Sequence, residues 1–420
     1  MVETGSSVTY SPPQWLDKKF LDEHLQKYHQ NMEIQVINFD VKPAVGKGEN
    51  YFSCIHRVNV TFISSGNNAT KKGDTTNISL IVKEESTDEW LVQTSAQFHI
   101  FDKETEFYRE ISSKINKILN ELGEEKLFAE LIGVCKLKKI MILEDLSADG
   151  YRILPVKDGF NFEETKALLK RIATFHATCA VLQEEKSDIF VTFKYGHISR
   201  GADAFKDYYP LTLDAVIEII SEWPDFAVYV EKLRRLRNRI YELGCQAYDL
   251  NLNHFNTLNH DDLWGPNFMI KTRDGSPEKP FENVKLIDFQ FAYWSSPTTD
   301  LFYFLNSSVN EALRPERFDE LVQFYHEQLV DFLKRLNYKK RIPTWPEFQE
   351  QYYERRILGF ISSCLIQPFM LNNTEEATFD IILQDNDIGL KARRGFYKGD
   401  KFQENLRKLI PFYDQLGTFD

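Results

Sequence analysis

The residues of this chain whose types and spacing best suit chemistry lie between His260 and Asn267 and at Asp288. The first segment has the pattern H-x-D-x-x-x-x-N, in which Asp262 is the acidic residue, and an apolar stretch that ends at Asp288 follows it. Transfer of a phosphoryl group to a hydroxyl needs a carboxylate that orients the hydroxyl or accepts its proton, and oxygen ligands that hold Mg²⁺ against the phosphates. Asp262 suits the first role, and Asn267 with Asp288 suits the second. An isolated D-x-x-x-x-N pattern is more often a helix cap or a turn, so the prediction depends on the other parts of such a site being present.

Two short apolar segments must position these side chains. Residues 267–271 and 284–289 have strand character, and the polar segment 272–280 between them contains Gly and Pro. This pattern predicts a β-hairpin. Such a hairpin would bring Asn267 and Asp288 together at one edge.

A glycine-containing segment further upstream is a candidate for contact with phosphates. Gly46 and Gly48 lie between two predicted strands, where glycines let backbone N–H groups approach a phosphate closely. Two glycines in a hairpin are more often only a turn, so this signal is weak. The chain has no Walker A pattern, so the sequence does not support a P-loop NTPase.

Lys83 ends the apolar strand at residues 78–82, an arrangement that can direct an ammonium group at nucleotide phosphates. It needs an acidic partner. Glu104 on the following predicted helix can be that partner, and Glu106 is the rival. For both glutamates the alternative is a solvated helix face.

The hydrophobic periodicity predicts an α+β fold with two lobes. A small antiparallel-sheet lobe is expected over residues 1–146, with helices at 15–29 and 95–119 and strands at 34–41, 52–63, 77–84 and 139–143. A mostly helical lobe is expected over residues 147–420, with helices at 162–182, 224–248, 317–336 and 347–370.

The composition limits the function classes. The chain has 420 residues and a formal net charge of −12, which makes nucleic acid and anionic membranes poor default partners. Its five cysteines are scattered singly, which is typical of intracellular proteins. We expect no membrane span, no secretory leader and a cytoplasmic location, and the sequence implies no protein partner.

Taken together, the motifs resemble the kinase-like phosphotransferases, and more closely the insect ecdysteroid kinase-like family, which is related to choline and aminoglycoside kinases. The resemblance covers nearly the whole chain. Its landmarks are the glycine segment 46–52, Lys83, the F-x-x-E-x-x-F-Y helix start at 101–108, the segment 143–146 followed by Gly150 and Tyr151, the helix segment 175–177, the 260–267 loop and the segment 287–290.

The resemblance implies a bilobal protein kinase-like fold and ATP-dependent phosphorylation of a small-molecule hydroxyl. Asp262 would be the catalytic base, and Asn267 and Asp288 would bind Mg²⁺. Lys83 and Glu104 would form an ion pair, and the hinge from Glu144 to Leu146 would contact adenine. The residues assigned to ATP on this basis are Gly46, Gly48, Asn50, Lys83, Glu104, Glu144 and Leu146.

Two further residues have structural interpretations. Asp300, at a predicted helix start, is expected to cap that helix or to brace the 260–267 loop. His176, on an apolar helix, is expected to be a packed histidine that hydrogen-bonds beneath this loop. One departure from related small-molecule kinases is Asp261, which stands where Gly is usual.

Several functions remain open. The favoured one is a kinase for a hydrophobic alcohol, such as an ecdysteroid or a plant-derived or xenobiotic compound in detoxification. A choline- or ethanolamine-type acceptor is a variant, because aromatic faces attract quaternary ammonium groups. A protein kinase is disfavoured because no activation segment ending in A-P-E follows Asp288. A catalytically silent relative that binds a nucleotide or another ligand is the remaining alternative.

Overall fold

The computed structural model describes residues 10–44, 52–64, 75–155, 158–372 and 378–420. The chain forms two compact units, which are described separately. The first comprises Met1–Ser95, Thr105–Ser113 and Phe128–Tyr151, and the second comprises Ala96–Glu104, Lys114–Leu127 and Arg152–Asp420. The predicted boundary at residue 146 divides the chain once, whereas two segments before it, Ala96–Glu104 and Lys114–Leu127, belong to the second unit.

The first unit is built on a five-stranded antiparallel sheet with the strand order β1-β2-β3-β5-β4. Its strands are β1 (Gln35–Pro43), β2 (Ser53–Ile63), β3 (Thr75–Glu85), β4 (Leu131–Cys135) and β5 (Ile140–Glu144). From His56 to the end of β2 every second side chain is buried, namely His56, Val58, Val60 and Phe62, as expected for a strand with one face on a core.

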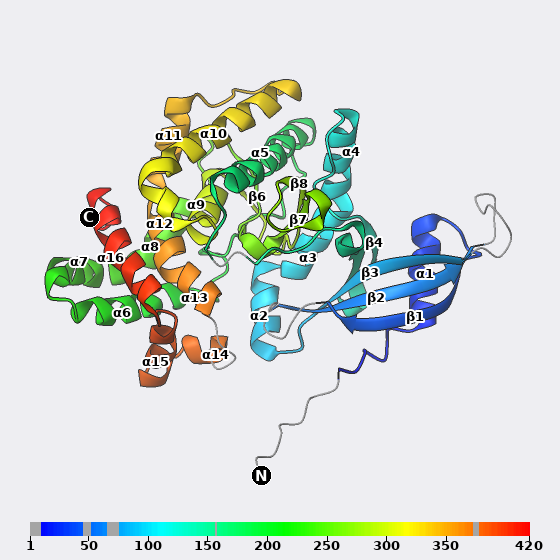
Figure 1. The fold of residues 1–420 in the computed structure, drawn as a ribbon, viewed down its shortest axis with the longest axis horizontal. Coiled ribbons are helices and arrows are strands. Elements are labelled where there is room, and N and C mark those ends of the chain that lie inside the picture. Colours follow the sequence, from blue (N-terminus) through cyan, green and yellow to red (C-terminus); the bar gives the residue numbers. More distant parts are fainter. Residues whose placement is uncertain (1–9, 45–51, 65–74, 156–157, 373–377) are drawn as a thin grey trace, which may run out of the picture. The chain divides into compact units, whose positions relative to one another are not determined.

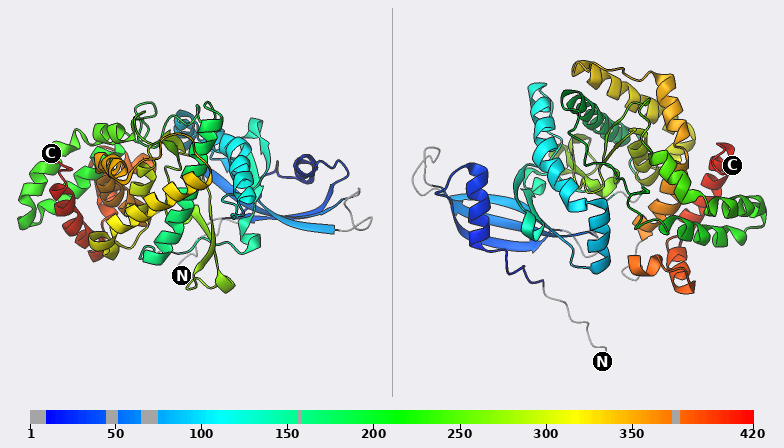
Figure 2. Two further views of the ribbon diagram at one scale, coloured as in Figure 1. Left: turned by 90° about the horizontal axis from the view of Figure 1, so that it is seen from above. Right: turned by 180° about the vertical axis from the view of Figure 1, so that it is seen from behind.

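Helix α1 (Lys18–His29) covers one face of this sheet (Figures 1 and 2). It begins after Asp17, whose carboxylate accepts a hydrogen bond from the backbone N–H of Phe20 at 2.8 Å. Leu21 and Leu25 are buried on the face of the helix that contacts the sheet, and they share one apolar core with Val58. Burial of this stripe holds the helix on the strands.

The region between β3 and β4 differs from the sequence expectation. It contains α2 (Glu89–Phe98), α3 (Ile100–Glu106), a π-helical segment (Phe107–Ser112) and α4 (Ser113–Glu121). The prediction of one helix over residues 95–119 was wrong, because His99 has a φ of 54° and a left-handed residue interrupts the helix.

The second unit is mostly helical and also contains two small antiparallel strand pairs, of which β6, β7 and β8 are labelled in Figure 1. The pairs are β7 (Phe268–Thr272) with β8 (Phe281–Leu286) and β6 (Thr257–Asn259) with β9 (Tyr293–Ser295). Its α-helices from Arg152 onward are α5 (Phe162–Glu185), α6 (Tyr208–Ser221), α7 (Ala227–Arg237), α8 (Ile240–Tyr248), α9 (Thr298–Ser307), α10 (Arg314–Arg335), α11 (Trp345–Glu354), α12 (Ile357–Phe360), α13 (Gln367–Asn372), α14 (Phe379–Ile382), α15 (Asp387–Gly395) and α16 (Asp400–Gln415). Helices α5 and α10 lie side by side, as do α6 and α7.

The predicted hairpin is confirmed, with Phe268 paired to Leu286 across β7 and β8. Two predicted long helices are interrupted. The helix expected over 224–248 breaks between Arg237 and Ile240, and the one expected over 347–370 breaks after Glu354. The predicted α+β fold, with a small antiparallel sheet and a mostly helical part, is confirmed.

Within the described ranges, the structure contains no helix with the length and apolar character that crossing a bilayer requires.

Candidate functional site

The 260–267 loop is held by one buried carboxylate, that of Asp300 in the first turn of α9. Its Oδ2 accepts a hydrogen bond from the backbone N–H of His260 at 2.7 Å, and its Oδ1 accepts one from the N–H of Asp261 at 2.8 Å. Nε2 of His176 on α5 lies 3.1 Å from the same Oδ2. The expected brace is therefore confirmed, as is the packed position of His176. The capping alternative was wrong, because Pro297 occupies the N-cap position of α9.

We expect the variant Asp300→Asn to unfold more easily than the wild type by about 2–3 kcal/mol. In the wild type the backbone N–H groups of His260 and Asp261 donate to the two buried carboxylate oxygens of Asp300. In the variant one of these oxygens is replaced by an NH₂ group, which cannot accept a hydrogen bond. Equilibrium unfolding in urea measures the difference. Asp319→Asn, at an exposed position on α10, is the matched control. Equal stability of wild type and Asp300→Asn would show that the loop does not depend on this carboxylate.

His260 connects the loop to the strand segment before Asp288. Its Nε2 donates to the carbonyl oxygen of Ile287 at 2.8 Å, and its Nδ1 accepts from the N–H of Asp262 at 3.3 Å. This pair of contacts corresponds to a neutral ring with its proton on Nε2. The ring also contacts Phe289, with 4.5 Å between the ring centroids.

Asp262 is partly buried and has two side-chain donors. Its Oδ1 accepts from the hydroxyl of Tyr303 at 2.9 Å, and its Oδ2 accepts from Nδ2 of Asn267 at 3.1 Å. Burial raises the pKa of Asp262 to about 6, and the negative charge of Asp288 adds to the increase, although His260, the hydrogen bond from Tyr303 and His197 oppose it. A fixed carboxyl group whose pKa approaches neutrality is suited to accept a proton.

Asn267 and Asp288 lie at the same end of the hairpin as Asp262. The N–H of Ile287 donates to the carbonyl oxygen of Asn267 at 3.1 Å, which places the residue before Asp288 against Asn267. Asp288 has a φ of 70°, a left-handed conformation that Asp tolerates better than most residues. The structure therefore brings together the three residues that the sequence assigned to catalysis and metal binding.

The donor set fits Mg²⁺. Nδ2 of Asn267 donates to the backbone oxygen of Asp262 at 2.7 Å and to its carboxylate, so these bonds do not use the amide Oδ1, which can serve with the carboxylate of Asp288 as an oxygen ligand. Mg²⁺ prefers oxygen ligands and is commonly bound by one or two carboxylates together with substrate phosphates. Nowhere among the described residues do three or more His, Cys, Asp or Glu side chains form a metal cluster. Mg²⁺ bound in this way does not require one.

Asp261 is the centre of a second hydrogen-bond network. Its Oδ1 accepts from the hydroxyl of Tyr248 at 2.6 Å, and its Oδ2 accepts from the backbone N–H of His197 at 2.6 Å. Burial lowers the pKa of His197, but the charge and hydrogen bonding of Asp261 outweigh it, so that this pKa is raised overall. A Cβ on Gly196 would lie 2.4 Å from Oδ2 of Asp261, so the close approach requires glycine. The departure at Asp261 thus creates a contact to residues 196–197.

The sequence interpretation missed three of these residues, namely Tyr248, His197 and Tyr303. Tyr248 and His197 lie in segments without a motif, and only the fold brings them to the loop. Tyr303 lies in a conspicuous aromatic run, F-Y-F, but the run gives no sign that its hydroxyl bonds to Asp262.

The residues assigned to ATP are placed as follows. Lys83 lies on β3 opposite Ile55 and is buried, whereas Glu104 is buried on α3. Because Lys83 belongs to the first unit and Glu104 to the second, their pairing, and the choice between Glu104 and Glu106, stays a prediction. The remaining glycine-segment residues, Gly46, Gly48 and Asn50, lie outside the described residues.

The predicted hinge follows β5 in the first unit. Oε2 of Glu144 accepts from the backbone N–H of Glu130 at 3.0 Å, and the buried Leu146 begins a 3-10 turn (Leu146–Asp149). Asp145 lies between these two residues. Burial acts to raise its pKa, but the hydrogen bonds from Ser147 and Ser79 and the positive charge of Arg57 outweigh burial, so the pKa of Asp145 is lowered overall. These bonds hold the segment to the sheet, and its contact with adenine stays a prediction.

Residues 47–338 of the chain match the ecdysteroid kinase-like family. No curated protein matches the sequence significantly.

Several solved structures resemble the chain over almost its full length. A spectinomycin phosphotransferase in complex with ADP and spectinomycin has 14% sequence identity and a TM-score of 0.45, with 96% of this chain and 100% of that chain covered. A microcompartment-associated aminopropanol kinase has 11% identity and a TM-score of 0.43, with coverages of 96% and 99%. The choline kinase LicA from Streptococcus pneumoniae has 12% identity and a TM-score of 0.38, with coverages of 93% and 98%. The family of the chain is therefore assigned from the match over residues 47–338 and not from these structures.

Proposed function

The chain belongs to the ecdysteroid kinase-like family, and from this premise we propose that it is a cytoplasmic kinase that transfers the γ-phosphoryl group of ATP to a hydroxyl of a hydrophobic small molecule. The observation that carries this proposal is the environment of Asp262. Its carboxylate is fixed by Tyr303 and Asn267 and has a pKa of about 6 beside Asp288.

In the proposed reaction the acceptor oxygen forms a bond to the γ-phosphorus while the bond from that phosphorus to the β–γ bridging oxygen breaks. Asp262 accepts the proton of the acceptor hydroxyl. The hydrogen bonds from Tyr303 and Asn267 keep its carboxylate oriented during this step. Asn267 and Asp288 would hold Mg²⁺, which supplies positive charge to the phosphates. Lys83 would bind the same phosphates from its strand.

For the acceptor, we propose a hydrophobic alcohol such as an ecdysteroid or a plant-derived or xenobiotic compound. Aromatic side chains near the loop support this choice. Phe291 contacts Phe98 and Phe205, with ring centroids 5.4 and 6.1 Å apart, and it lies 6.4 Å from the ring of His197. Phe98 and Phe291 are themselves buried, so of these rings it is the half-buried Phe205 that offers apolar area to a rigid, ring-shaped molecule.

The test is a phosphorylation assay with the full chain, Mg-ATP and a panel of ecdysteroids, plant-derived alcohols, choline, ethanolamine and a generic protein. Product mass is measured directly. We expect one added phosphate on an apolar alcohol. Transfer only to choline or ethanolamine would select the cationic acceptor class. Absence of both transfer and Mg-ATP binding would contradict the proposal and favour the silent relative.

The pKa of Asp262 predicts the pH dependence of the reaction. A general base must be ionised, so activity should be lost as the pH falls through about 6, the folded-state pKa. A cation bound at Asp288 would offset the repulsion between the two carboxylates, so with saturating Mg-ATP the acid limb should move to lower pH. Profiles between pH 4.5 and 8 measure both positions of this acid limb: kcat/KM reports the free enzyme, and kcat reports the enzyme saturated with Mg-ATP. A rate that is independent of pH across this range would exclude Asp262 as the base, provided that transfer is the rate-limiting step.

A further inference from the structure

The segment between α5 and α6 is anchored where it passes the 260–267 loop. Nζ of Lys103 on α3 donates to the carbonyl oxygen of Tyr195 at 2.5 Å, and Oδ2 of Asp261 accepts from the backbone N–H of His197 at 2.6 Å. Lys103 and Asp261 are both buried. The backbone is therefore held on both sides of Gly196, and buried contacts determine where the side chain of His197 begins.

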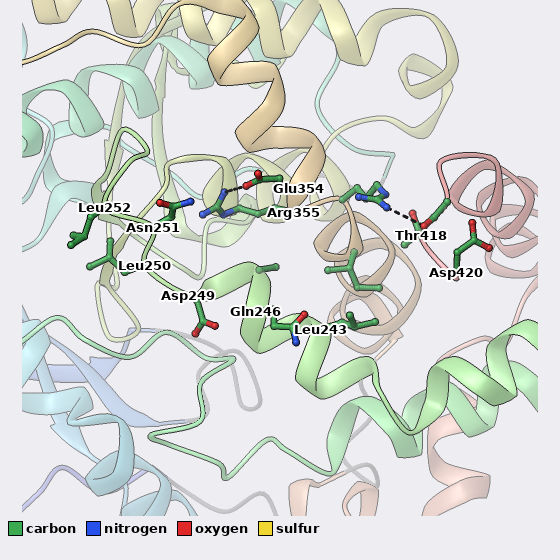
Figure 3. Close-up of a pocket in the computed structure, with 14 residues that line it drawn as sticks. Leu243, Gln246, Asp249, Leu250, Asn251, Leu252, Glu354, Arg355, Thr418 and Asp420 are labelled. Carbon is green, nitrogen blue, oxygen red and sulfur yellow. Dashed lines mark hydrogen bonds and ion pairs between the residues drawn. The ribbon is translucent and has the colours of Figure 1, made fainter.

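A third contact holds the same segment further along the chain. Arg200 forms ion pairs with Glu242 on α8 and with Asp249 directly after this helix, and the N–O distance is 2.6 Å in both. Asp249 also lines a pocket of about 540 Å³, and Figure 3 shows it at the end of α8. His197 and Asp261 do not line this pocket, so their contacts belong to the 260–267 loop.

The ring of His197 uses one of its two nitrogens for Asp261. Nδ1 lies 3.0 Å from Oδ2 of Asp261 and 3.1 Å from the hydroxyl oxygen of Tyr248, whose own proton is donated to Oδ1 of Asp261 at 2.6 Å. Nε2 lies 3.4 Å from the same hydroxyl, which is longer than the roughly 2.7–3.2 Å of a normal N–H···O hydrogen bond. Because Nδ1 is occupied, Nε2 is the nitrogen that can bond to a ligand.

The same ring borders Asp262. Its centroid lies 5.4 Å from that of Tyr303 in an edge-to-face contact, and the hydroxyl of Tyr303 donates to Oδ1 of Asp262 at 2.9 Å. The charges of His197 and Asp262 act on each other, since each shifts the pKa of the other. The side chain of His197 is 11% exposed, so it is not sealed in the core. An acceptor whose hydroxyl bonds to Asp262 therefore binds beside this ring.

The surroundings of His197 favour a positively charged ring. Burial acts to lower its pKa, but the carboxylate of Asp261 and the charge of Asp262 outweigh burial, so the pKa of His197 is raised overall. Lys103 is a second cation within reach of Asp261; burial lowers its pKa to about 8, and Asp261 opposes the decrease. At neutral pH two cations thus accompany the one carboxylate of Asp261, and this cluster has no spare negative charge for a cationic acceptor.

Because the ring of His197 and the carboxylate of Asp262 both contact Tyr303, one small acceptor can reach both through two oxygen atoms that lie close together. We propose that the imidazolium of His197 determines the class of acceptor: its Nε2–H donates to an oxygen on the carbon next to the reacting hydroxyl, as in a vicinal diol, and its charge repels acceptors that carry an ammonium group. Asp261 is the positioning residue that orients the ring. This inference rests on the proposed function and narrows its acceptor to a neutral alcohol with a second, adjacent oxygen.

The first test measures binding, which does not require turnover. NMR of the full chain with isotope-labelled histidine follows Nε2 of His197 while three separate probes are added: a cyclohexanediol with adjacent cis hydroxyls, cyclohexanol and choline. We expect the diol to shift the Nε2 signal saturably, and cyclohexanol and choline to bind at least tenfold more weakly. If the diol leaves this signal unchanged, or if cyclohexanol binds as tightly as the diol, the inference is wrong. Binding can succeed without transfer, and transfer to a simple alcohol can succeed without this contact, so the two failures are distinguishable.

Two variants test the charge by isothermal titration. In His197→Gln the Kd for the diol should rise several-fold while the Kd for choline falls several-fold, because the hydrogen bond is weakened and the repulsion is removed. Asp261→Gly should change both values in the same directions, and its backbone is suited to glycine because Asp261 has a φ of 64°. His29→Gln, at an exposed position on α1, is the matched control and should change neither. A purely structural role of His197 would weaken both probes together, and that result would overturn the inference.

Discussion

The variant Asp262→Asn is expected to lose about 10³-fold in kcat for phosphoryl transfer, with nucleotide affinity nearly unchanged. Proton acceptance by a positioned side chain contributes about 10²–10⁴-fold in enzymes, and an amide cannot accept this proton. Asn has nearly the same shape as Asp, and the hydroxyl of Tyr303 can still donate to its oxygen. The bond from Nδ2 of Asn267 to the side chain is lost, but the same Nδ2 keeps its 2.7 Å bond to the backbone oxygen of residue 262, which holds Asn267 in place. The loss should therefore fall on kcat and not on the Kd for Mg-ATP.

Single-turnover kinetics with an identified acceptor, together with nucleotide titration on the same preparation, measure the two quantities separately. Asp274→Asn, in the exposed turn between β7 and β8, is the matched control and should behave as the wild type. Wild-type turnover by Asp262→Asn would show that another group takes the proton.

The variant Asp288→Ala should lose the Mg²⁺-dependent part of nucleotide binding. The carboxylate of Asp288 is the charged member of the proposed ligand pair, and the amide of Asn267 alone is a weak ligand for a hard cation. A second effect follows from the charge itself. Without Asp288, one of the two causes that raise the pKa of Asp262 is removed, so that this pKa should fall below about 6 while burial still keeps it raised.

Nucleotide titration with and without Mg²⁺ tests the first effect, and a pH titration of Asp262 by NMR of a labelled chain tests the second. The affinity of the variant should be the same in Mg²⁺ and in EDTA. A variant that retained the wild-type dependence on Mg²⁺ would place the metal on other residues.

The hairpin and the 260–267 loop could be predicted from the sequence because their signals are local. A polar turn between two apolar segments specifies the strand pair, and the strand pair determines where Asn267 lies relative to the residue before Asp288. The strands β1, β2 and β3 of the first unit followed from alternation and β5 from a short apolar run, whereas β4 was missed. That strand has five residues, all only partly buried, and its pattern does not alternate.

The rest of the site depends on contacts between segments far apart in sequence. Tyr303 reaches Asp262 across 41 positions and His197 reaches Asp261 across 64, so no spacing rule indicates either contact.

The breaks in long helices were missed for a related reason. Hydrophobic periodicity continues across both breaks, so it does not indicate them. At His99 the helix is interrupted by a left-handed φ that only the folded backbone shows. At Arg355, which lines a pocket, the chain turns between α11 and α12.

The carboxylate of Asp300 has a consequence for the living cell. One side chain supports both the fold and the geometry of the loop, since it bonds to His176 of α5 and to the backbone of His260 and Asp261. A loss of about 2 kcal/mol is enough to change the steady-state abundance of a protein several-fold through chaperones and proteases. An inherited substitution at residue 300 would therefore reduce the amount of folded protein in the cell, and the level of its messenger RNA would overstate that amount.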